Sequence, residues 1–305
     1  MERILFITGS SGFIASRLLR KINRNNFKNI YCLSRNESGI IREFSRYENF
    51  KFIKGDIFDA NLYAPYLTSA DIVVHLAAAT GKAGPEEYFK VNAEGTRFLI
   101  KQCEQAGVKN FLFISSIAVK FKEISRYYYA QSKLQGEIAV KESRLNYSIV
   151  RPAIVIGKGS PILKSLLKLT GAPVVPVFGD GKVKVQPIYV DDLADCLVSI
   201  IDEEIFLNET FDIGGPEVIT IEDFIKKISR AYFKKEPGVI HIPLKLLLPV
   251  LTFFEKFFYS LLPFNVGQVS SFRFDGTIEE NRLFQKHSPH MKNIDEMLRA
   301  VIGNG

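Results

Sequence analysis

The sequence predicts an α/β fold with a doubly wound parallel sheet, followed by a smaller C-terminal domain. Three observations predict it. Short apolar runs alternate with amphipathic helical patterns through the first half of the 305-residue chain, a rhythm typical of a parallel sheet with helices on both faces. The first apolar run ends at a glycine turn, residues 8–15, that opens a helix. After Pro152 the rhythm loosens, which indicates a second and less regular part.

Each element of the first half follows from its own pattern. Strands are expected at the apolar runs 4–8, 29–34, 50–54, 71–75, 110–116 and 147–150. Helices are expected at 12–23, 85–107 and 127–144. Gly107 is a stop signal for the second of these helices. Ligands of such sheets bind beyond the carboxyl ends of the strands, so the residues that follow each strand are the candidates for a site.

The second half has fewer regular patterns. A helix is expected at 161–169, a strand at 185–190, a strand and turn at 211–215, and a helix from Thr220 onward. Asp191 and Asp192 stand at the head of a further helix, where acidic side chains are favourable. We expect residues 1–155 to form mainly the sheet domain. Residues 156–305 then combine sheet-completing segments with a smaller C-terminal domain.

Composition bounds the class of protein and its partners. The 40 basic and 33 acidic side chains leave a formal charge of +7, which suits an anionic small-molecule ligand and equally an unspecific surface property. The sequence has no zinc-knuckle spacing and no basic helix with interleaved aromatic residues. We therefore expect neither a metal site nor a nucleic-acid partner.

Cysteine usage and the start of the chain bear on the compartment. Cys32, Cys103 and Cys196 are far apart and odd in number, so we interpret them as reduced core residues in a reducing compartment. The first strand starts almost at Met1, which leaves no room for a signal peptide. Together these observations predict a cytoplasmic protein.

The longest apolar stretch, residues 242–264, has two interpretations. It is interrupted by Lys245, Pro249, Glu255 and Lys256 and is too short and broken to span a bilayer. It can lie weakly on a membrane surface as an amphipathic helix. The favoured interpretation is a helix of the second domain that packs on the core or on a dimer partner.

The glycine turn after the first strand indicates a bound dinucleotide. Gly9 permits the tight turn, Gly12 lets the backbone approach a pyrophosphate, and Ala15, in the third glycine's place, keeps the helix close to the sheet. The helix N-terminus then faces the negative phosphates. Because this motif follows a strand and opens a helix, its context supports a cofactor site. The cofactor-binding residues expected of the turn are Gly9, Ser11, Gly12, Phe13 and Ile14.

The end of the second strand bears on the choice between NADP and NAD. An NAD site usually carries an acid there for the ribose 2′-hydroxyl, and this chain has Ser34 and Arg35 instead. Arg35 can pair with the 2′-phosphate of NADP, and Ser34 can hydrogen-bond it; a solvated surface arginine is the alternative. NADP is therefore favoured, and NAD stays possible. Asp56, after the third strand, either accepts from the adenine amino group or only forms a turn after Gly55.

Tyr129 and Lys133, four residues apart in Tyr-Ala-Gln-Ser-Lys, indicate hydride chemistry. This spacing places both side chains on one helix face. Tyrosine, with an ordinary pKa of about 10, is a poor base at neutral pH, and a nearby ammonium favours its phenolate. Tyr129 can then take a proton from an alcohol as hydride leaves its carbon, while Ser116 hydrogen-bonds the reacting oxygen. The alternative is an ordinary aromatic–cation pair on a helix surface.

The order of motifs over about residues 1–230 resembles the extended short-chain dehydrogenase/reductase family, the NAD(P)-dependent epimerases and dehydratases. The matching motifs are Thr8-Gly9-x-x-Gly12-Phe13-Ile14, Gly55-Asp56, His75-Leu76-Ala77-Ala78, Val91-Asn92-x-x-Gly95-Thr96, Ser115-Ser116, Tyr129-x-x-x-Lys133, Arg151-Pro152, Val190-Asp191-Asp192-Leu193-Ala194 and Asp212-Ile213-Gly214-Gly215. The resemblance implies a Rossmann domain that binds NAD(P), mainly residues 1–155. It also implies a small C-terminal substrate domain and a homodimer formed through helices such as 85–107 and 127–144.

The resemblance also implies roles for individual residues. Ser116, Tyr129 and Lys133 match the catalytic set, and Tyr129 and Lys133 also contact the cofactor. Asn92 matches a structural and cofactor-side asparagine, and Pro152 a residue near the nicotinamide amide. The remaining expected cofactor contacts are Ile57, Leu76, Ala77 and Ala78, in addition to Ser34, Arg35 and Asp56, which the strand ends themselves indicate.

Departures from the family pattern leave two functional hypotheses. Val119-Lys120-Phe121 stands where epimerases usually carry Val-Tyr-Gly, and the segment from Ser116 to Tyr129 is short. Residues 176–187 resemble atypical members such as the dehydrogenase-like accessory subunit of respiratory complex I, which hold NADP(H) without known turnover. The favoured hypothesis, based on the intact Ser-Tyr-Lys set, is an NAD(P)-dependent oxidoreductase or epimerase acting on an anionic substrate such as a nucleotide sugar. The alternative is a non-catalytic NADP(H)-binding structural or assembly protein.

Overall fold

The structure, a computed structural model, describes residues 3–81, 83–258 and 265–303, apart from the side chains of residues 256 and 258. The chain divides into two compact units that interleave along the sequence. The first unit comprises Met1–Ser116, Ser132–Arg151 and Leu193–Phe211, and the second comprises Ile117–Gln131, Pro152–Asp192 and Asp212–Gly305. The roles expected of the two parts of the sequence, cofactor binding and substrate binding, stay predictions.

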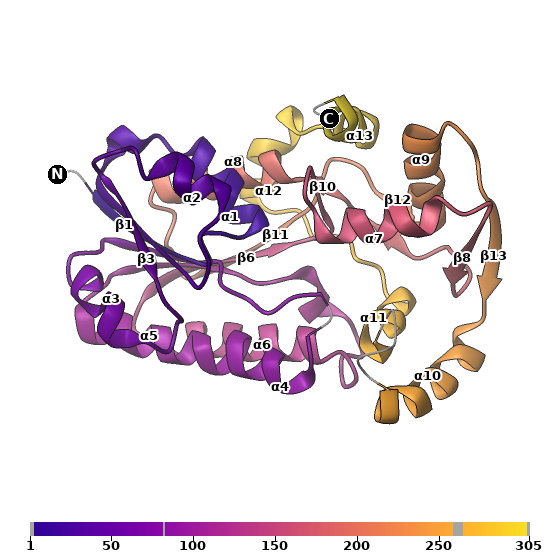
Figure 1. Cartoon of the computed structure of the whole chain (residues 1–305), viewed down its shortest axis with the longest axis horizontal. Coiled ribbons are helices and arrows are strands. Elements are labelled where there is room, and N and C mark those ends of the chain that lie inside the picture. Colours follow the sequence, from indigo (N-terminus) through magenta and orange to yellow (C-terminus); the bar gives the residue numbers. More distant parts are fainter. Residues whose placement is uncertain (1–2, 82, 259–264, 304–305) are drawn as a thin grey trace. The chain divides into compact units, whose positions relative to one another are not determined.

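A seven-stranded sheet forms the centre of the first unit (Figure 1), in the order β11-β6-β5-β4-β1-β2-β3. Its strands are β1 (Arg3–Thr8), β2 (Phe27–Ser34), β3 (Phe50–Lys54), β4 (Ile72–His75), β5 (Asn110–Ile114), β6 (Asn146–Pro152) and β11 (Glu209–Ile213). The pairs from β3 across β1 and β4 to β6 are all parallel. The chain moves outward from β1 to β3, returns to β4 beside β1, and then moves outward in the other direction. This arrangement confirms the predicted doubly wound α/β fold.

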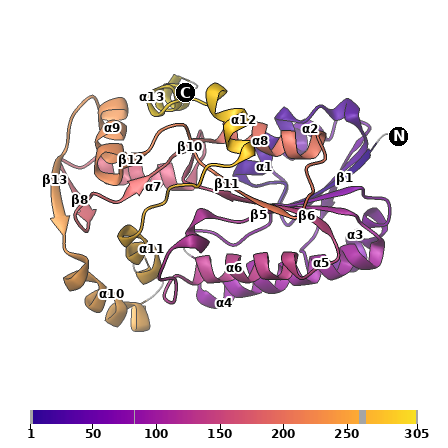
Figure 2. The ribbon, with the colours of Figure 1, turned by 180° about the vertical axis from the view of Figure 1, so that it is seen from behind.

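Helices cover both faces of this sheet. Figures 1 and 2 show one face beneath α1 (Phe13–Lys21), α2 (Gly39–Phe44) and α8 (Val190–Asp202), and the other beneath α3 (Ala60–Leu67), α5 (Gly95–Ala106) and α6 (Tyr128–Lys141). A short 3₁₀ turn at Arg24–Asn26 precedes β2.

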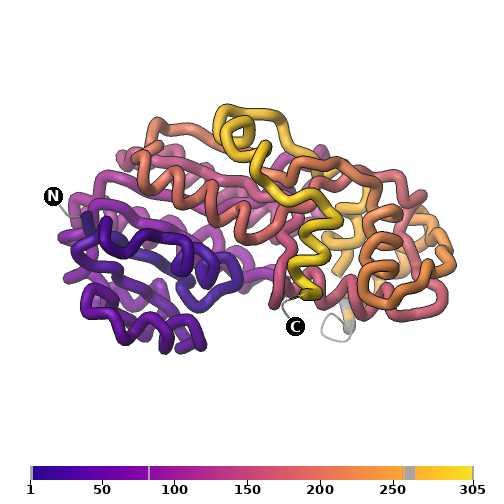
Figure 3. The backbone as a smooth tube through the Cα atoms, turned by 90° about the horizontal axis from the view of Figure 1, so that it is seen from above, coloured from indigo at the N-terminus to yellow at the C-terminus, as the bar shows by residue number. Residues whose placement is uncertain are grey.

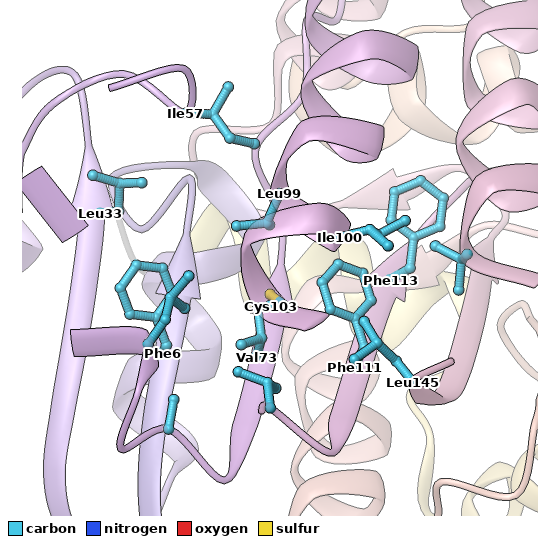
Figure 4. Packing of buried hydrophobic residues seen from close by; sticks show 14 of the residues in the cluster. Phe6, Leu33, Ile57, Val73, Leu99, Ile100, Cys103, Phe111, Phe113 and Leu145 are labelled. Atoms are coloured by element: carbon cyan, nitrogen blue, oxygen red, sulfur yellow. The ribbon is translucent and has the colours of Figure 1, made fainter. Parts of the chain in front are cut away.

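The main core of the first unit lies between the sheet and the helices α3, α5 and α6. Phe6, Val73 and Phe111 of the sheet belong to one buried cluster with Leu99 and Cys103 of α5, as Figure 4 shows. Cys32 and Cys196 are likewise buried, and all three cysteines are free thiols, which confirms that they are core residues. Burial raises the pKa of the Cys32 and Cys103 thiols, so both are poor nucleophiles.

The helix expected at 85–107 forms as three consecutive helical segments. These are α4 (Pro85–Tyr88), a π-helical turn (Phe89–Glu94) and α5, which ends at Gly107 with a φ of 77°. A π turn widens the helix by one residue and often occurs at functional positions. The turn contains Asn92, one of the residues expected at the cofactor site.

The prediction of one continuous strand at 185–190 is wrong. Two short strands form instead, β9 (Lys184–Val185), which pairs antiparallel with β12 (Ile219–Thr220), and β10 (Ile188–Tyr189), which pairs with β7 (Val155–Ile156). Pro187 between them has no amide hydrogen to donate to a ladder. The Gln186 carboxamide donates to the Gly215 carbonyl at 2.7 Å and accepts from the Ile278 amide at 3.1 Å. The chain therefore changes partners at these two residues.

The second unit consists of short helices and strand pairs. Its remaining elements are the 3₁₀ turn Ile117–Lys120, α7 (Pro161–Thr170), β8 (Val174–Phe178), α9 (Ile221–Phe233), β13 (Gly238–Ile242), α10 (Leu244–Phe258), α11 (Val266–Ser270), the 3₁₀ turn Ser271–Arg273, α12 (Arg282–His287), the 3₁₀ turn Ser288–His290 and α13 (Ile294–Gly303). β13 pairs in parallel with β8, and α7 packs on α9. Figure 3 shows α13, at the C-terminal end, beside α9. Among the described residues, no helix is both long enough and apolar enough to cross a membrane.

Candidate cofactor and hydride-transfer site

The turn between β1 and α1 is held against the end of β4. Gly9 has a φ of 66°, and a Cβ atom on it would lie 2.5 Å from the backbone nitrogen of Ala77. The Gly12 amide donates to the Gly9 carbonyl at 2.9 Å, and a Cβ on Gly12 would lie 3.0 Å from that oxygen. A larger residue therefore clashes at Gly9, and at Gly12 it fits only if the facing oxygen shifts. Ala15 is buried, so a small residue here keeps α1 close to the sheet.

The first turn of α1 is available to an anion. The helix begins after Gly12, which as N-cap offers no side-chain hydrogen bond to the first amides. Such amides together carry a partial positive charge. Phe13 and Ile14 supply the first residues of the helix, as expected for a phosphate-binding turn.

The end of β2 lies beside this turn. The Ser11 and Ser34 hydroxyls are 2.6 Å apart and hydrogen-bonded to each other. Ser34 is buried, and Arg35, which follows it, is exposed. The structure thus brings together the glycine turn and the two residues expected to select the 2′-phosphate.

Asp56 and Ile57 are engaged in local structure. Asp56 accepts a hydrogen bond from the Phe58 amide at 3.1 Å, so the turn-forming alternative left open by the sequence is present. The Ile57 side chain is buried in the core, and its carbonyl accepts from the Tyr63 hydroxyl at 2.6 Å. Contacts of either residue with a cofactor stay predictions.

A chain of buried hydrogen bonds connects the ends of β1 and β4 to the π turn. The Thr8 hydroxyl lies 2.7 Å from Nδ1 of His75, and Nε2 of His75 lies 2.9 Å from the Thr96 hydroxyl. Thr96 donates its own hydrogen to the Asn92 carbonyl at 2.8 Å. Nε2 of His75 must therefore be the donor to Thr96, and Nδ1 must accept from Thr8. Burial, with a smaller effect of Lys133, lowers the pKa of His75 to about 3, in keeping with this neutral tautomer.

Asn92 fastens three segments to one another. Its side chain accepts from the Ala79 amide at 2.8 Å and donates to the Ala79 carbonyl at 3.0 Å and to the Ser132 hydroxyl at 3.0 Å. The residues between β4 and Ala79, namely Leu76, Ala77 and Ala78, are half-buried. The structural role expected of Asn92 is thus visible in its contacts, and its cofactor role stays a prediction.

Lys133 is buried within the first unit. Its side chain is 2% exposed, and Nζ lies 4.2 Å from the centre of the Phe113 ring. Burial lowers the pKa of Lys133 to about 7, although Glu137, one turn further along α6, acts in the opposite direction. Perturbed pKa values of this kind cluster at functional sites.

Ser116 and Tyr129 stand at the ends of their elements. Ser116 follows β5 and precedes the 3₁₀ turn, and Tyr129 is the second residue of α6; both are half-buried. The Tyr129 ring lies 5.9 Å from that of Tyr127. Tyr129 and Lys133 are one turn apart on a continuous helix, as the spacing predicts. Pro152 is the last residue of β6 and is buried.

Glu137 was not predicted as part of the site. It is fully buried and accepts hydrogen bonds from the Ser115 hydroxyl at 2.5 Å and from Arg151, at 2.8 Å to Nε and 2.5 Å to the terminal nitrogen. This bidentate pair joins α6 to β6. The hydrogen bond from Ser115, which directly follows β5, joins the end of that strand to α6 as well. A signal was present in the sequence, because Glu137 follows Lys133 by four residues on the same helix face.

Lys120, which departs from the family pattern, has a structural partner. Within the second unit its Nζ lies 2.8 Å from Oδ2 of Asp212 and 2.9 Å from Oε1 of Glu279. Asp212 is buried, whereas Glu279 is exposed. Lys120 thus forms ion pairs with two carboxylates of the second unit.

Comparison with known proteins adds family evidence. The profile of the NAD dependent epimerase/dehydratase family matches residues 5–214. The chain is 27% identical over 259 residues to UDP-glucose 4-epimerase of Vibrio cholerae, covering 77% of each protein. It is 24% identical over 246 residues to a mitochondrial protein of Arabidopsis thaliana named NADH dehydrogenase [ubiquinone] 1 alpha subcomplex subunit 9, covering 76% of this chain and 59% of that one. For several curated relatives the chain spans only 59% to 63% of their length.

A solved structure supports the fold. UDP-glucuronic acid 4-epimerase from Bacillus cereus, in complex with NAD, matches with a TM-score of 0.69 and 20% sequence identity, covering 99% of both chains. At this identity the likeness shows the fold alone.

The Glu137–Arg151 pair makes a prediction about stability. In Glu137→Gln the guanidinium of Arg151 loses its negative partner within a largely buried site, which we expect to lower the free energy of unfolding by about 3 kcal/mol. Urea denaturation followed by circular dichroism measures the change. Glu142→Gln, at an exposed position of the segment that follows α6, is the matched control and should change stability by less than about 0.5 kcal/mol. Equal stability of the two variants would contradict the structural role of the pair.

The lowered pKa of His75 makes a prediction about pH. Unfolded His75 binds a proton below about pH 6.5, whereas the folded residue binds one only near pH 3. Its contribution to stability is therefore complete above about pH 6.5 and is lost as the pH falls towards 3. Between these values we expect His75→Gln to reduce the pH slope of the unfolding free energy by up to about 1.4 kcal/mol per pH unit. The measurement is urea denaturation across this pH range, and His290→Gln, at an exposed position, should keep the full slope.

Proposed function

The chain belongs to the NAD dependent epimerase/dehydratase family, and from this premise we propose that it is an NAD(P)-dependent enzyme that transfers hydride at an alcohol carbon. We further propose that the substrate is an anionic small molecule such as a nucleotide sugar, because the chain carries a charge of +7 and its V. cholerae relative is a UDP-glucose epimerase. The observation that carries the proposal is the pair of Tyr129 and Lys133 on one turn of α6, with the lysine desolvated. A homodimer and a cytoplasmic location stay predictions from the sequence.

The residues of the first unit fit a dinucleotide. The cradle formed by Gly9 and Gly12 has no room for a Cβ atom on Gly9 and only a tight space for one on Gly12. The N-cap residue of α1 offers no side-chain hydrogen bond to its first amides. This arrangement suits a pyrophosphate. The residues that would hold the cofactor are Gly9, Ser11, Gly12, Phe13, Ile14, Ser34, Arg35, Asn92, Lys133 and Pro152. When bound, the nicotinamide ring accepts or returns the hydride.

NADP is our proposal for the form of the cofactor. Arg35 is exposed at the end of β2, and Ser34 is hydrogen-bonded to Ser11 of the phosphate-binding turn. A guanidinium and a hydroxyl at this point are donors, and a 2′-phosphate offers acceptors. NAD is the cofactor in the B. cereus structure, so the test below must distinguish the two.

The proposed proton chemistry belongs to the α6 pair. The positive form of Lys133 favours the Tyr129 phenolate, and burial places the pKa of Lys133 at about 7, so the charged form is well populated at neutral pH. The phenolate takes the proton of the substrate hydroxyl while hydride leaves the carbon that bears this hydroxyl. Ser116 donates a hydrogen bond to the reacting oxygen. In the reverse direction Tyr129 returns the proton to that oxygen.

A non-catalytic nucleotide-binding role is the second candidate. Lys120 stands in an ion-paired position where epimerases usually carry tyrosine, and the Arabidopsis relative is named as a subunit of a larger assembly. The cofactor cradle and Lys133 serve both functions, whereas Tyr129 as an acid–base group is needed only for turnover. The two hypotheses therefore differ in what Tyr129 does.

Tyr129→Phe tests the catalytic hypothesis. We expect turnover of UDP-glucose or dTDP-glucose with added NADP or NAD to fall by about 10²- to 10⁴-fold, because the acid–base group is gone, while the Kd for NADPH changes less than about twofold. Product formation is followed by chromatography, and NADPH binding by fluorescence titration. Tyr128→Phe, one residue earlier and exposed, should retain full turnover. If Tyr129→Phe turns over as fast as the wild type, the proposed mechanism is wrong.

Mass spectrometry of nucleotide released from the denatured protein, combined with Arg35→Ala, tests the cofactor. We expect any retained nucleotide to carry the 2′-phosphate. We also expect Arg35→Ala to weaken NADPH binding about 10- to 100-fold, the value of a charge-assisted hydrogen bond, and to leave NADH binding unchanged. Arg42→Ala, at an exposed position of α2, is the matched control. Equal weakening of NADPH and NADH would refute the 2′-phosphate contact.

A further inference from the structure

The outer face of α10, in the second unit, is apolar and exposed. Leu246 is 70% exposed, Phe253 63% and Phe257 61%. Val250 and Phe254 are also exposed. At offsets of 4, 7, 8 and 11 residues from Leu246, these five side chains form one stripe along the helix. We call them the α10 stripe.

The inner side of α10 carries the polar contacts of the helix. The Thr252 hydroxyl donates to the Leu248 carbonyl at 2.7 Å and accepts from Arg126 at 3.1 Å. A carboxylate oxygen of Glu255 accepts from the Val266 amide at 3.0 Å. A surface helix of a globular protein normally shows the opposite pattern, with its polar face towards solvent. Water is therefore a poor neighbour for the stripe.

Aromatic side chains dominate one end of the stripe. The Phe253 ring lies 5.8 Å from that of Phe254 and 5.5 Å from that of Phe257. Clusters of exposed phenylalanine and leucine on an amphipathic helix are typical of surfaces that enter the headgroup region of a bilayer. α10 has 15 residues, or about 22 Å of helix, which is too short to span a membrane and sufficient to lie in its surface.

The charged residues beside the α10 stripe indicate what kind of surface the stripe contacts. Lys245, next to Leu246, is exposed, and so is Arg126, which donates a hydrogen bond to Thr252. The one acidic residue in the α10 sequence is Glu255, which is half-buried, and burial raises its pKa. Glu123 is also exposed and interacts electrostatically with two exposed cations, Arg126 and Arg273. Exposed cations thus outnumber exposed carboxylates at this margin, which we call the basic margin. Anionic headgroups complement such a margin.

We propose that α10 docks the protein on an anionic lipid bilayer, with the α10 stripe inserted among the lipids and the basic margin at the headgroups. The sequence favoured a helix packed on the core or on a partner, and the inner side of α10 does pack within the second unit, on α11. Residues 259–264 of the apolar stretch lie outside the described residues. This inference is independent of the proposed redox activity.

Vesicle co-sedimentation of the full chain tests the proposal. We expect binding to vesicles of equal parts phosphatidylcholine and phosphatidylglycerol at about 0.1 M salt, and at least tenfold weaker binding to phosphatidylcholine alone. Leu246→Gln/Phe253→Gln should reduce binding to the mixed vesicles tenfold or more, since two inserted side chains are lost. Glutamine keeps the helix propensity, and circular dichroism checks the fold. Leu62→Gln/Leu207→Gln, at exposed positions of the first unit, is the matched control and should bind like the wild type.

Three results would overturn the proposal. The first is wild-type protein that fails to bind the mixed vesicles. The second is a stripe variant that binds these vesicles as tightly as the control variant does. The third is a dimer in analytical ultracentrifugation that the stripe variant converts to a monomer, together with no vesicle binding, which would assign the stripe to a second copy of the chain.

Discussion

The contact between the β1–α1 turn and the end of β4 is the constraint on which the rest of the first unit depends. Since a Cβ on Gly9 would lie 2.5 Å from the Ala77 nitrogen, the turn reaches this position only with glycine. β1 and β4 are neighbours at the point where the sheet reverses its winding order, which is where such sheets bind ligands. A backbone contact there creates the cradle, and it also places Thr8 beside His75.

From that contact a buried polar network extends to α6. Thr8, His75, Thr96, Asn92 and Ser132 form its successive members. The Glu137–Arg151 pair provides a second tie between α6 and the sheet. Because buried polar groups are costly unless satisfied, these contacts allow α6 few positions. Because α6 is held in this position, the Lys133 side chain is buried. This burial lowers the pKa of Lys133.

The residues proposed for nucleotide binding and those proposed for turnover lie largely in different units. The cradle, the network and Lys133 belong to the first unit, and they suit any protein that holds a dinucleotide. Tyr129 and Lys120 belong to the second unit. The α10 stripe adds a surface whose chemistry is unrelated to either. The residues proposed to hold the nucleotide thus lie mainly in the first unit, and Tyr129 and the α10 stripe lie in the second.

The sequence by itself determined the fold class, the glycine turn and the spacing of Tyr129 and Lys133, because each depends on local patterns of apolar, small and charged residues. It also placed the six strands of the first half, since a parallel strand buried on both faces reads as an apolar run. Only the tertiary structure decided the break at Gln186–Pro187, the pairing of Glu137 with Arg151, the tautomer of His75 and the outward direction of the α10 stripe. Each of these depends on partners distant in sequence or on exposure to solvent, which periodicity alone does not encode.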